Sequence, residues 1–479
     1  MPLAPGTRFQ SDVPARLDRL PWSPWHWRVV VALGITWMLD GLEVTLVSAI
    51  GPVLMRPDTL GLSSTELGGT ATAYLAGAVL GALVFGRLTD LFGRKRLFLV
   101  TLAVYLLATL ASGLAWSFGS FCAFRFLTGA GIGGEYSAVN SAIDELIPAR
   151  VRGRADLGIN STYWLGTALG AALTFVLLDP RLLPPSLGWR CVFAVGAALG
   201  ASVLALRRHV PESPRWLLLH GRDEDAEAIV GDIEQEVTRG RPAALPRVER
   251  RVSLEAKGSV TFAGIARVLL RRNARRTVLG LSLMIAQAFA YNGVFFTYAL
   301  VLARFYGVAP GHVSLYLLPF ALSNLLGPLA LGHLFDRVGR RKMIALTYST
   351  SGALIVLAGG GLLGAWFGPV TQTLAWSAVF FVASSAASSA YLTVSELFPV
   401  ELRGMAIALF YAAGTALGGV AAPALFGALL ETGRRAPVFA GYVVGAALML
   451  AAAGVTLVFG VAAEGRSLEA VNAAADVEG

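Results

Sequence analysis

Long apolar stretches separated by short polar loops run along most of this chain of 479 residues. A bilayer core takes about 20 apolar residues per helix, and lipid tolerates no unpaired backbone groups, so each stretch predicts a membrane-spanning α-helix. Twelve stretches are found, at residues 27–52, 66–86, 97–116, 120–143, 156–178, 189–206, 277–303, 313–331, 343–363, 372–394, 405–430 and 437–461. The pattern predicts an all-α membrane protein with twelve transmembrane helices.

The composition and the distribution of charge agree with this prediction. The chain is 55% hydrophobic and 14% charged, with a mean hydropathy of +0.64, whereas soluble domains carry about 25% charged residues. Four short loops on one side carry twelve Lys and Arg residues, against six on the other side. This positive-inside distribution places both termini in the cytoplasm. It also explains the net charge of +9 without a nucleic-acid partner.

Other features exclude several classes of function. Residues 1–26 lack the apolar core of a signal peptide, so we expect the first helix to direct insertion into a plasma membrane, of the bacterial inner-membrane type. Cys122 and Cys191 lie in apolar segments, which indicates packing and not a disulfide framework. The histidines fall near helix ends or in loops, so we expect no metal. No nucleophile, base and orienting group occur together, so the sequence predicts neither an enzyme nor a cofactor.

Two loops repeat in the same order. The stretch 86–95 returns as 332–341, with Asp90 and Asp336 246 residues apart, and Glu145 returns 251 residues later as Glu396. Matching order at nearly one offset predicts two homologous six-helix halves. The expected division is a cytoplasmic tail at 1–26, a first bundle at 27–206, a cytoplasmic loop with short helices at 207–276, a second bundle at 277–461 and a cytoplasmic tail at 462–479. Within the loop, residues 221–238 predict a short amphipathic helix.

These loops resemble those of the major facilitator superfamily. Pro211 to Arg215, the pairs Glu145/Arg152 and Glu396/Arg403, and the tail Gly465 to Glu469 are similar to its sugar-porter and metabolite:proton symporter branch. The resemblance implies two pseudo-symmetric six-helix bundles, a central site and alternating access. Asn160 and Thr167 stand where sugar porters usually have glutamines, and Asp40, Glu43 and Glu135 lie in motifs that instead resemble the organic-acid and phosphate symporters of the superfamily.

Four charged residues lie at membrane depth, where charge persists only beside a partner or water. They are Asp40, Glu43, Arg125 and Glu135. An opposite charge favours the ionised form of a carboxyl and desolvation disfavours it, so a pair that forms and breaks can bind and release a proton. We expect Asp40 or Glu43 to take the proton and Arg125 to set its affinity, with Glu135 as a rival carrier. The alternative is a static ion pair that specifies packing.

Polar and aromatic residues within apolar helices are candidates for the substrate site. Gln287, Tyr291 and Phe295 recur at helical spacing, which predicts one face of a helix and is typical of either packing or a binding site. The candidate set is Asn160, Trp164, Gln287, Tyr291, Asn292, Phe295, Asn324 and Tyr391.

The repeated loops predict a gate on the cytoplasmic side. We expect Asp90 to meet the start of the helix at 405–430, and Asp336 to meet the start of the helix at 156–178, because a carboxylate is attracted to the positive N-terminal end of a helix. The residues assigned to the gate are Gly86, Asp90, Gly93, Arg94, Glu145, Arg152, Asp336, Arg340, Glu396 and Arg403.

The sequence favours a secondary active transporter that imports a small polar metabolite (a sugar, a polyol or a small organic acid) with protons, as a monomer in the bilayer. A passive facilitator of the same fold, or a transporter-like nutrient sensor, remains as an alternative.

Overall fold

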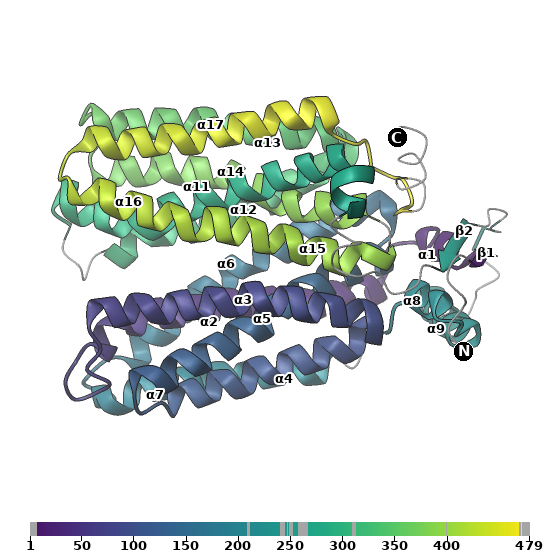
Figure 1. The fold of residues 1–479 in the computed structure, drawn as a ribbon, viewed down its shortest axis with the longest axis horizontal. Helices are drawn as coiled ribbons and strands as arrows, with labels where there is room; N and C mark the ends of the chain where they lie inside the picture. The colour runs from purple at the N-terminus through teal and green to yellow at the C-terminus, as the bar shows by residue number, and fades with distance from the viewer. Residues whose placement is uncertain are drawn as a thin grey trace.

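The computed structural model describes residues 7–207, 211–239, 245, 246, 248, 252–256, 267–308, 313–398, 400–468 and 471. In this part of the chain, twelve helical segments lie side by side in two bundles (Figure 1). The first bundle contains α2 (Pro24–Leu54), α3 (Ser64–Phe92), α4 (Arg94–Gly113), α5 (Phe118–Leu146), α6 (Arg152–Leu177) and α7 (Pro185–Arg207). The second contains α11 (Ala274–Tyr306), α12 (Val313–Arg337), α13 (Arg340–Leu363), α14 (Pro369–Leu397), a segment made of α15 (Val400–Gly414), η5 (Thr415–Val420) and α16 (Ala421–Glu431), and α17 (Arg435–Phe459). The prediction of an all-α, twelve-helix membrane protein is confirmed.

Nine helices in the described part of the chain are long and apolar enough to be candidate membrane spans. Helices α5, α6 and α7 are not among them. Helices α5 and α6 carry Arg125, Glu135, Arg152 and Asp156 within their length. Together with Asp40 and Glu43 of α2, these residues bring charge into the first bundle.

Glycine fixes the turns between the repeated helices. Gly93 follows the last residue of α3 and Gly339 precedes the first residue of α13, and their φ angles are +90° and +109°. Residues that carry a side chain rarely adopt this backbone conformation, so both turns require glycine. The repeated motif thus places Arg94 and Arg340 at the same point, the first residue of the following helix.

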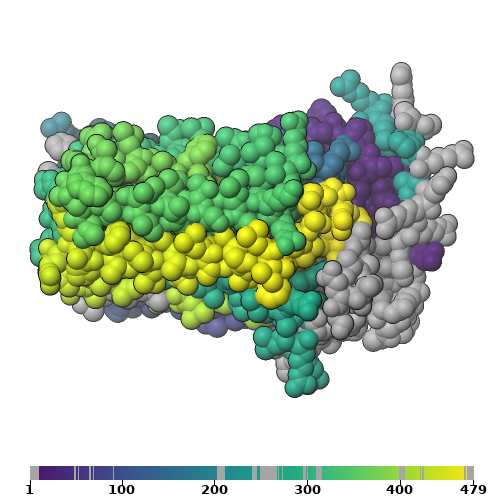
Figure 2. Space-filling view, turned by 90° about the horizontal axis from the view of Figure 1, so that it is seen from above, coloured from purple at the N-terminus to yellow at the C-terminus, as the bar shows by residue number. Residues whose placement is uncertain are grey.

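Small elements gather at one end of the bundles, which we call the capped end (Figure 1). They are β1 (Thr7–Ser11), α1 (Val13–Asp18), α8 (Pro214–Leu219), α9 (Asp223–Val237) and β2 (Val252–Ala256). The predicted amphipathic helix at 221–238 is α9, with Ala226, Val230 and Ile233 buried. Strands β1 and β2 pair antiparallel, from Thr7 opposite Ala256 to Ser11 opposite Val252, a pairing that the hydropathy pattern did not predict. Figure 2 shows the N-terminal segment in purple at this end, beside the green and yellow helices of the second bundle.

The N-terminal segment is docked on the central loop by charge and by apolar burial. Arg16 donates to both carboxylate oxygens of Glu234, at 3.0 and 2.8 Å, and Arg19 donates to Oε1 of Glu234 at 2.5 Å. Leu17 is 3% exposed and Leu20 is fully buried. Burial alone would raise the pKa of Glu234, but the hydrogen bonds from Arg16 and Arg19 outweigh it and lower that pKa.

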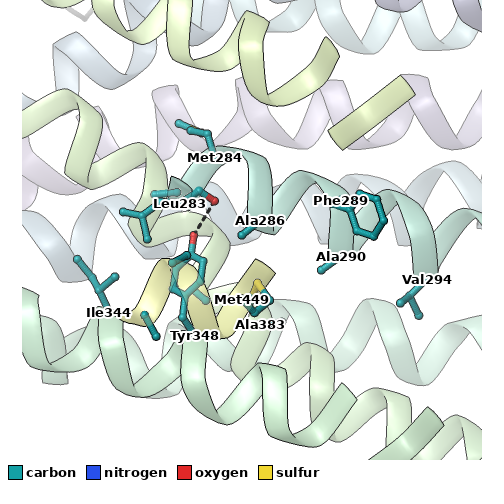
Figure 3. Packing of buried hydrophobic residues seen from close by; sticks show 14 of the residues in the cluster. Leu283, Met284, Ala286, Phe289, Ala290, Val294, Ile344, Tyr348, Ala383 and Met449 are labelled. Atoms are coloured by element: carbon teal, nitrogen blue, oxygen red, sulfur yellow. Dashed lines mark hydrogen bonds between the residues drawn. The ribbon is translucent and has the colours of Figure 1, made fainter. Parts of the chain in front are cut away.

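Backbones approach very closely inside each bundle. A Cβ atom on Gly166 of α6 would collide with the carbonyl oxygen of Met38 in α2, and one on Gly41 with that of Tyr163. Small residues allow such contacts between membrane helices. In the second bundle the buried Tyr348 of α13 donates a hydrogen bond to the carbonyl of Leu283 in α11 at 3.0 Å (Figure 3). This polar contact joins two apolar helices across the core.

Replacing Gly166 with Ala should destabilise the first bundle by about 1–3 kcal/mol, since the added methyl group meets backbone that cannot rotate away. Denaturant titration of the purified protein measures the change. Gly427→Ala is the matched control, because a Cβ there meets nothing within 4 Å. Equal stability of the two variants would contradict the close packing of α2 and α6.

Docking of the N-terminal segment should weaken in acid. Because the pKa of Glu234 is lowered by folding, its contribution is complete above its unfolded pKa of about 4.3. It is lost as the pH falls through the lower, folded value. Limited proteolysis between Ser11 and Leu20 should therefore accelerate below about pH 4. Glu234→Gln should show the faster cleavage already at neutral pH, whereas the exposed Asp232→Asn should not.

Candidate functional site

Glu43 of α2 and Arg125 of α5 form an ion pair inside the first bundle. Glu43 is fully buried and Arg125 is 1% exposed. The guanidinium also lies over the ring of Tyr74, 4.8 Å from its centre, which adds a cation–π contact. The two residues that were expected to neutralise each other in the membrane are thus brought together by α2 and α5.

Asp40 lies one helical turn before Glu43 and lines a cavity. Its carboxylate accepts hydrogen bonds from the hydroxyls of Tyr74, at 3.2 Å, and Tyr136. A small cavity of about 10 Å³ separates Asp40 from the buried Glu135, which is roughly the space of one water molecule. All four predicted proton-coupling residues therefore occupy one region of the first bundle.

A cavity of about 530 Å³ lies between the two bundles. Small-molecule sites usually have about 300–1,000 Å³ and combine apolar walls with a few polar groups. Six of the eight predicted substrate residues line it: Asn160, Trp164, Gln287, Tyr291, Asn292 and Tyr391. Asp40 and Arg125 line it as well, so the proton-coupling region opens into the candidate substrate site.

The other two predicted substrate residues are Asn324, which lies behind the cavity wall, and Phe295. Asn324 of α12 is fully buried and accepts a hydrogen bond from the Tyr291 hydroxyl at 2.5 Å, while its own amide donates to Phe320 at 2.8 Å. It therefore orients a wall residue from behind. The side chain of Phe295 lies outside the described residues.

Aromatic residues that the sequence analysis did not select form much of the wall. Tyr136 of α5 stacks on Tyr411 of α15 with ring centres 4.3 Å apart, and on Tyr391 at 6.0 Å. Trp37 meets Tyr391 edge-on at 5.6 Å. Trp37 and Tyr136 could have been found from their positions, since Trp37 lies one helical turn before Asp40 and Tyr136 follows Glu135 directly.

A π-helical segment shapes the wall contributed by the second bundle. The predicted continuous helix at 405–430 is interrupted by η5, whose residues Thr415, Gly419 and Val420 line the cavity. A Cβ on Gly418 would collide with Ala288 and the backbone of Phe289 in α11. Single π turns inside helices are frequent at functional sites, and here the segment combines close approach to α11 with backbone at the cavity.

The two bundles are joined at the capped end by residues of the repeated motifs. Asp336 of α12 accepts hydrogen bonds from the backbone N–H groups of Gly153, at 3.1 Å, and Arg154, at 2.8 Å. These N–H groups belong to the first turn of α6, where Asp336 was expected. Arg152 of α6 reaches Glu396 of α14 at 3.5 Å, a second charged contact between bundles.

Within each bundle the motif arginine holds the motif glutamate. Arg340 pairs with Asp336 at 2.8 Å and with Glu396 at 3.2 Å. Arg94 pairs with Glu145 in the first bundle. Gly86 is a buried residue of α3, and the side chains of Asp90 and Arg403 lie outside the described residues.

These contacts close the capped end, and the cavity extends the other way. Its lining includes Val47 near the far end of α2 and Thr70 near the start of α3. Both positions lie away from the capped end. The structure thus represents a transporter-like state closed on one side.

Comparison with known proteins agrees with this arrangement. A family described as "Sugar (and other) transporter" matches residues 25–475. The chain is 27% identical to the niacin transporter NiaP of Acinetobacter baylyi, over 96% of this chain and 99% of that protein. It is 26% identical to the 4-hydroxybenzoate transporter PcaK of the same organism, over 84% of each chain. Among solved structures, the proton:xylose symporter XylE bound to 6-bromo-6-deoxy-D-glucose has a TM-score of 0.77 at 20% identity and covers 94% of this chain and 99% of that chain.

Removing one partner of the central ion pair should be costly. Arg125→Met leaves Glu43 charged and buried, which should lower the free energy of unfolding by about 3–5 kcal/mol. The double variant Arg125→Met with Glu43→Gln should regain most of this loss, because no uncompensated charge remains. Detergent-induced unfolding of the wild type, Arg125→Met, Glu43→Gln and the double variant tests the coupling, and simple additivity of the two single changes would refute it.

Proposed function

The chain belongs to the sugar (and other) transporter family, and on this basis we propose that it imports a small, flat aromatic monocarboxylate together with protons by alternating access. The observation that carries the proposal is the Glu43–Arg125 pair at an aromatic cavity between two bundles. The capped end faces the cytoplasm, as the positive-inside distribution favours. The protein acts as a monomer in a bacterial inner membrane.

The aromatic wall supports a planar substrate. The rings lining the cavity belong to Trp37, Tyr74, Tyr136, Tyr163, Trp164, Tyr291, Tyr391 and Tyr411. Aromatic side chains bind flat rings by stacking and edge-on contacts, and their hydroxyls offer hydrogen bonds at the rim of such a ring. NiaP and PcaK, which resemble this chain over most of its length, are named as transporters of niacin and 4-hydroxybenzoate.

Arg125 supports an acidic substrate. Its guanidinium lines the cavity but is neutralised by Glu43 in this structure. Protonation of Glu43 removes that competing charge, so the guanidinium becomes available to a substrate carboxylate in a bidentate contact. A proton and a carboxylate are then bound together, because each favours the other.

Asp40 and Glu135 support passage of the proton. Asp40 lies at the cavity wall with Tyr74 and Tyr136 as donors, and Glu135 lies behind it across a cavity large enough for one water. Closely spaced acids titrate as a coupled set. The transported proton is therefore shared among Asp40, Glu43 and Glu135. Protonation of Glu43 decides whether the substrate carboxylate can bind Arg125.

The gate at the capped end supports alternating access. Asp336 and Arg152 hold the bundles together through hydrogen bonds and charge pairs that exist only while this end is closed. Substrate and proton enter from the opposite side, and separation of these contacts opens the cavity to the cytoplasm.

Proton-driven uptake into liposomes tests the proposal. Vesicles containing the purified protein should accumulate 4-hydroxybenzoate or nicotinate when the medium is more acidic than the lumen, and an uncoupler should abolish accumulation. Glu43→Gln should reduce accumulation at least about tenfold, which corresponds to about 1.4 kcal/mol, and retain exchange. Asp58→Asn, at an exposed ion pair with Arg56, is the matched control.

The outcomes separate the alternatives. Uptake that reaches equilibrium and is insensitive to the uncoupler would identify a passive facilitator. Accumulation of xylose in place of both aromatic acids would contradict the substrate class. A binding test supports the transport assay, since a ligand at 100 times its Kd stabilises the protein by about 2.7 kcal/mol.

A further inference from the structure

A buried acid at the gate is not accounted for by the ion pairs described above. Asp156 lies on the second turn of α6, one turn after Arg152, and is 1% exposed. Its carboxylate accepts a hydrogen bond from the amide of Asn160 at 3.1 Å. A carboxylate so deeply buried is costly unless charge or a proton compensates it.

The charged groups around Asp156 are predominantly acidic. It lies within electrostatic range of the carboxylates of Asp144 on α5 and Glu396 on α14, and of the guanidinium of Arg340 on α13. Arg340 already contacts Glu396 and Asp336, so its charge is shared among several acids.

The remaining neighbours do not alter this balance. Arg152 on the same helix pairs with Glu396 at 3.5 Å and with Asp18 of α1 at 3.6 Å. Helix α2 packs along α6 and carries no charged residue between Arg28 and Asp40. Arg190 of α7 donates to the carbonyl of Gly113 at the far end of the bundle. Arg215 of α8 donates to the backbone of Glu145.

The interface between bundles passes through this acid group. Ser395 of α14 donates to Asp144 of α5 at 3.2 Å. The two residues are 251 apart, which is the offset of the sequence repeat, so each is the counterpart of the other and their contact lies near the axis that relates the two halves. The same offset relates Asp156 to the buried Ile407. Asp156 thus has no acidic counterpart in the second bundle, and it lies at the interface between the two bundles.

Asn160 connects Asp156 to the central cavity. Its side chain lines that cavity, and its amide nitrogen faces Asp156. Its amide oxygen is buried and, within the described part of the chain, has no hydrogen-bond partner. An amide can donate to a carboxylate or, turned over, accept from a carboxylic acid. The unused oxygen therefore matches a neutral Asp156 as well as the nitrogen matches a charged one.

We propose that Asp156 is a second proton-binding site of the transport cycle, apart from the group Asp40, Glu43 and Glu135, and that it holds a proton while the capped end is closed and releases it when that end opens. The inference builds on the proposed proton-coupled transport. While the gate is closed, the neutral acid relieves repulsion with Asp144 and Glu396. When the bundles part, water reaches the carboxyl, stabilises its charge and carries the proton to the cytoplasmic side. Acidity at that side therefore favours the closed gate.

The distance across the gate, measured as a function of pH, tests this inference. Lys95 and Lys342 are exposed and lie in the first turns of α4 and α13, which are corresponding helices of the two bundles. Spin labels at Cys substitutions of these residues, with Cys122 and Cys191 replaced by Ala, report the closed fraction between pH 5 and pH 8. One linked proton changes the ratio of closed to open protein by up to about tenfold per pH unit. We expect that ratio to fall as the pH rises.

Substitutions separate Asp156 from the central site. Asp156→Asn should flatten the pH dependence and keep the gate closed, because the amide imitates the neutral acid. Asp156→Ala removes the titrating group without that imitation and gives the same test of slope if the first variant does not fold. The exposed Asp232→Asn on α9 is the matched control and should retain the wild-type slope.

Three results would overturn the inference: a wild-type gate insensitive to pH, closure favoured at alkaline pH, or an unchanged slope in both Asp156 variants. Each can occur while liposomes still show proton-driven uptake, so failure here is distinct from failure of the proposed function.

Discussion

A charge inside an apolar helix bundle must be compensated, and this constraint organises the structure around two groups of buried ionisable residues. In the first, Glu43 and Arg125 neutralise each other beside the cavity. In the second, Arg152, Arg340, Asp336 and Glu396 tie the bundles together at the capped end. Because an unpartnered charge is costly in lipid, every movement that breaks one of these contacts requires water, a proton or a substrate to replace it. Conformational change and ion chemistry are therefore joined by electrostatics.

The internal repeat supplies similar parts, and the differences between copies give them separate tasks. Gly93 and Gly339 make the same turn, and Arg94 and Arg340 each hold a glutamate. In contrast, Arg125 and the acids near it belong to the first half, whereas the π-helical segment at Thr415–Val420 belongs to the second. One half thus contributes charge to the cavity, and the other contributes backbone irregularity and part of the aromatic wall.

The hydropathy pattern predicted the helices because a lipid bilayer leaves the backbone few alternatives to the α-helix. The pairing of Glu43 with Arg125 could also be expected, because the apolar segments contain few charged residues that could neutralise Arg125. The direction in which each polar side chain points was harder to predict from the sequence. Asn292 and Asn324 are both amides in apolar helices, yet one lines the cavity and the other supports Tyr291 from behind. Helix rotation decides between them, and packing sets that rotation. The π turn changes the helical phase after Gly414, so periodicity alone could not place Thr415. The pairing of β1 with β2 joins segments more than 240 residues apart, beyond the reach of local patterns.

That pairing also orders events during synthesis. Strand β1 hydrogen-bonds to residues 252–256, so its partner is made only after all six helices of the first bundle. The N-terminal segment, including Arg16 and Arg19, is therefore synthesised before its partners Glu234 and β2, while the helices of the first bundle enter the bilayer. The small sheet can consequently form only after the first half and the linker as far as residue 256 have been synthesised.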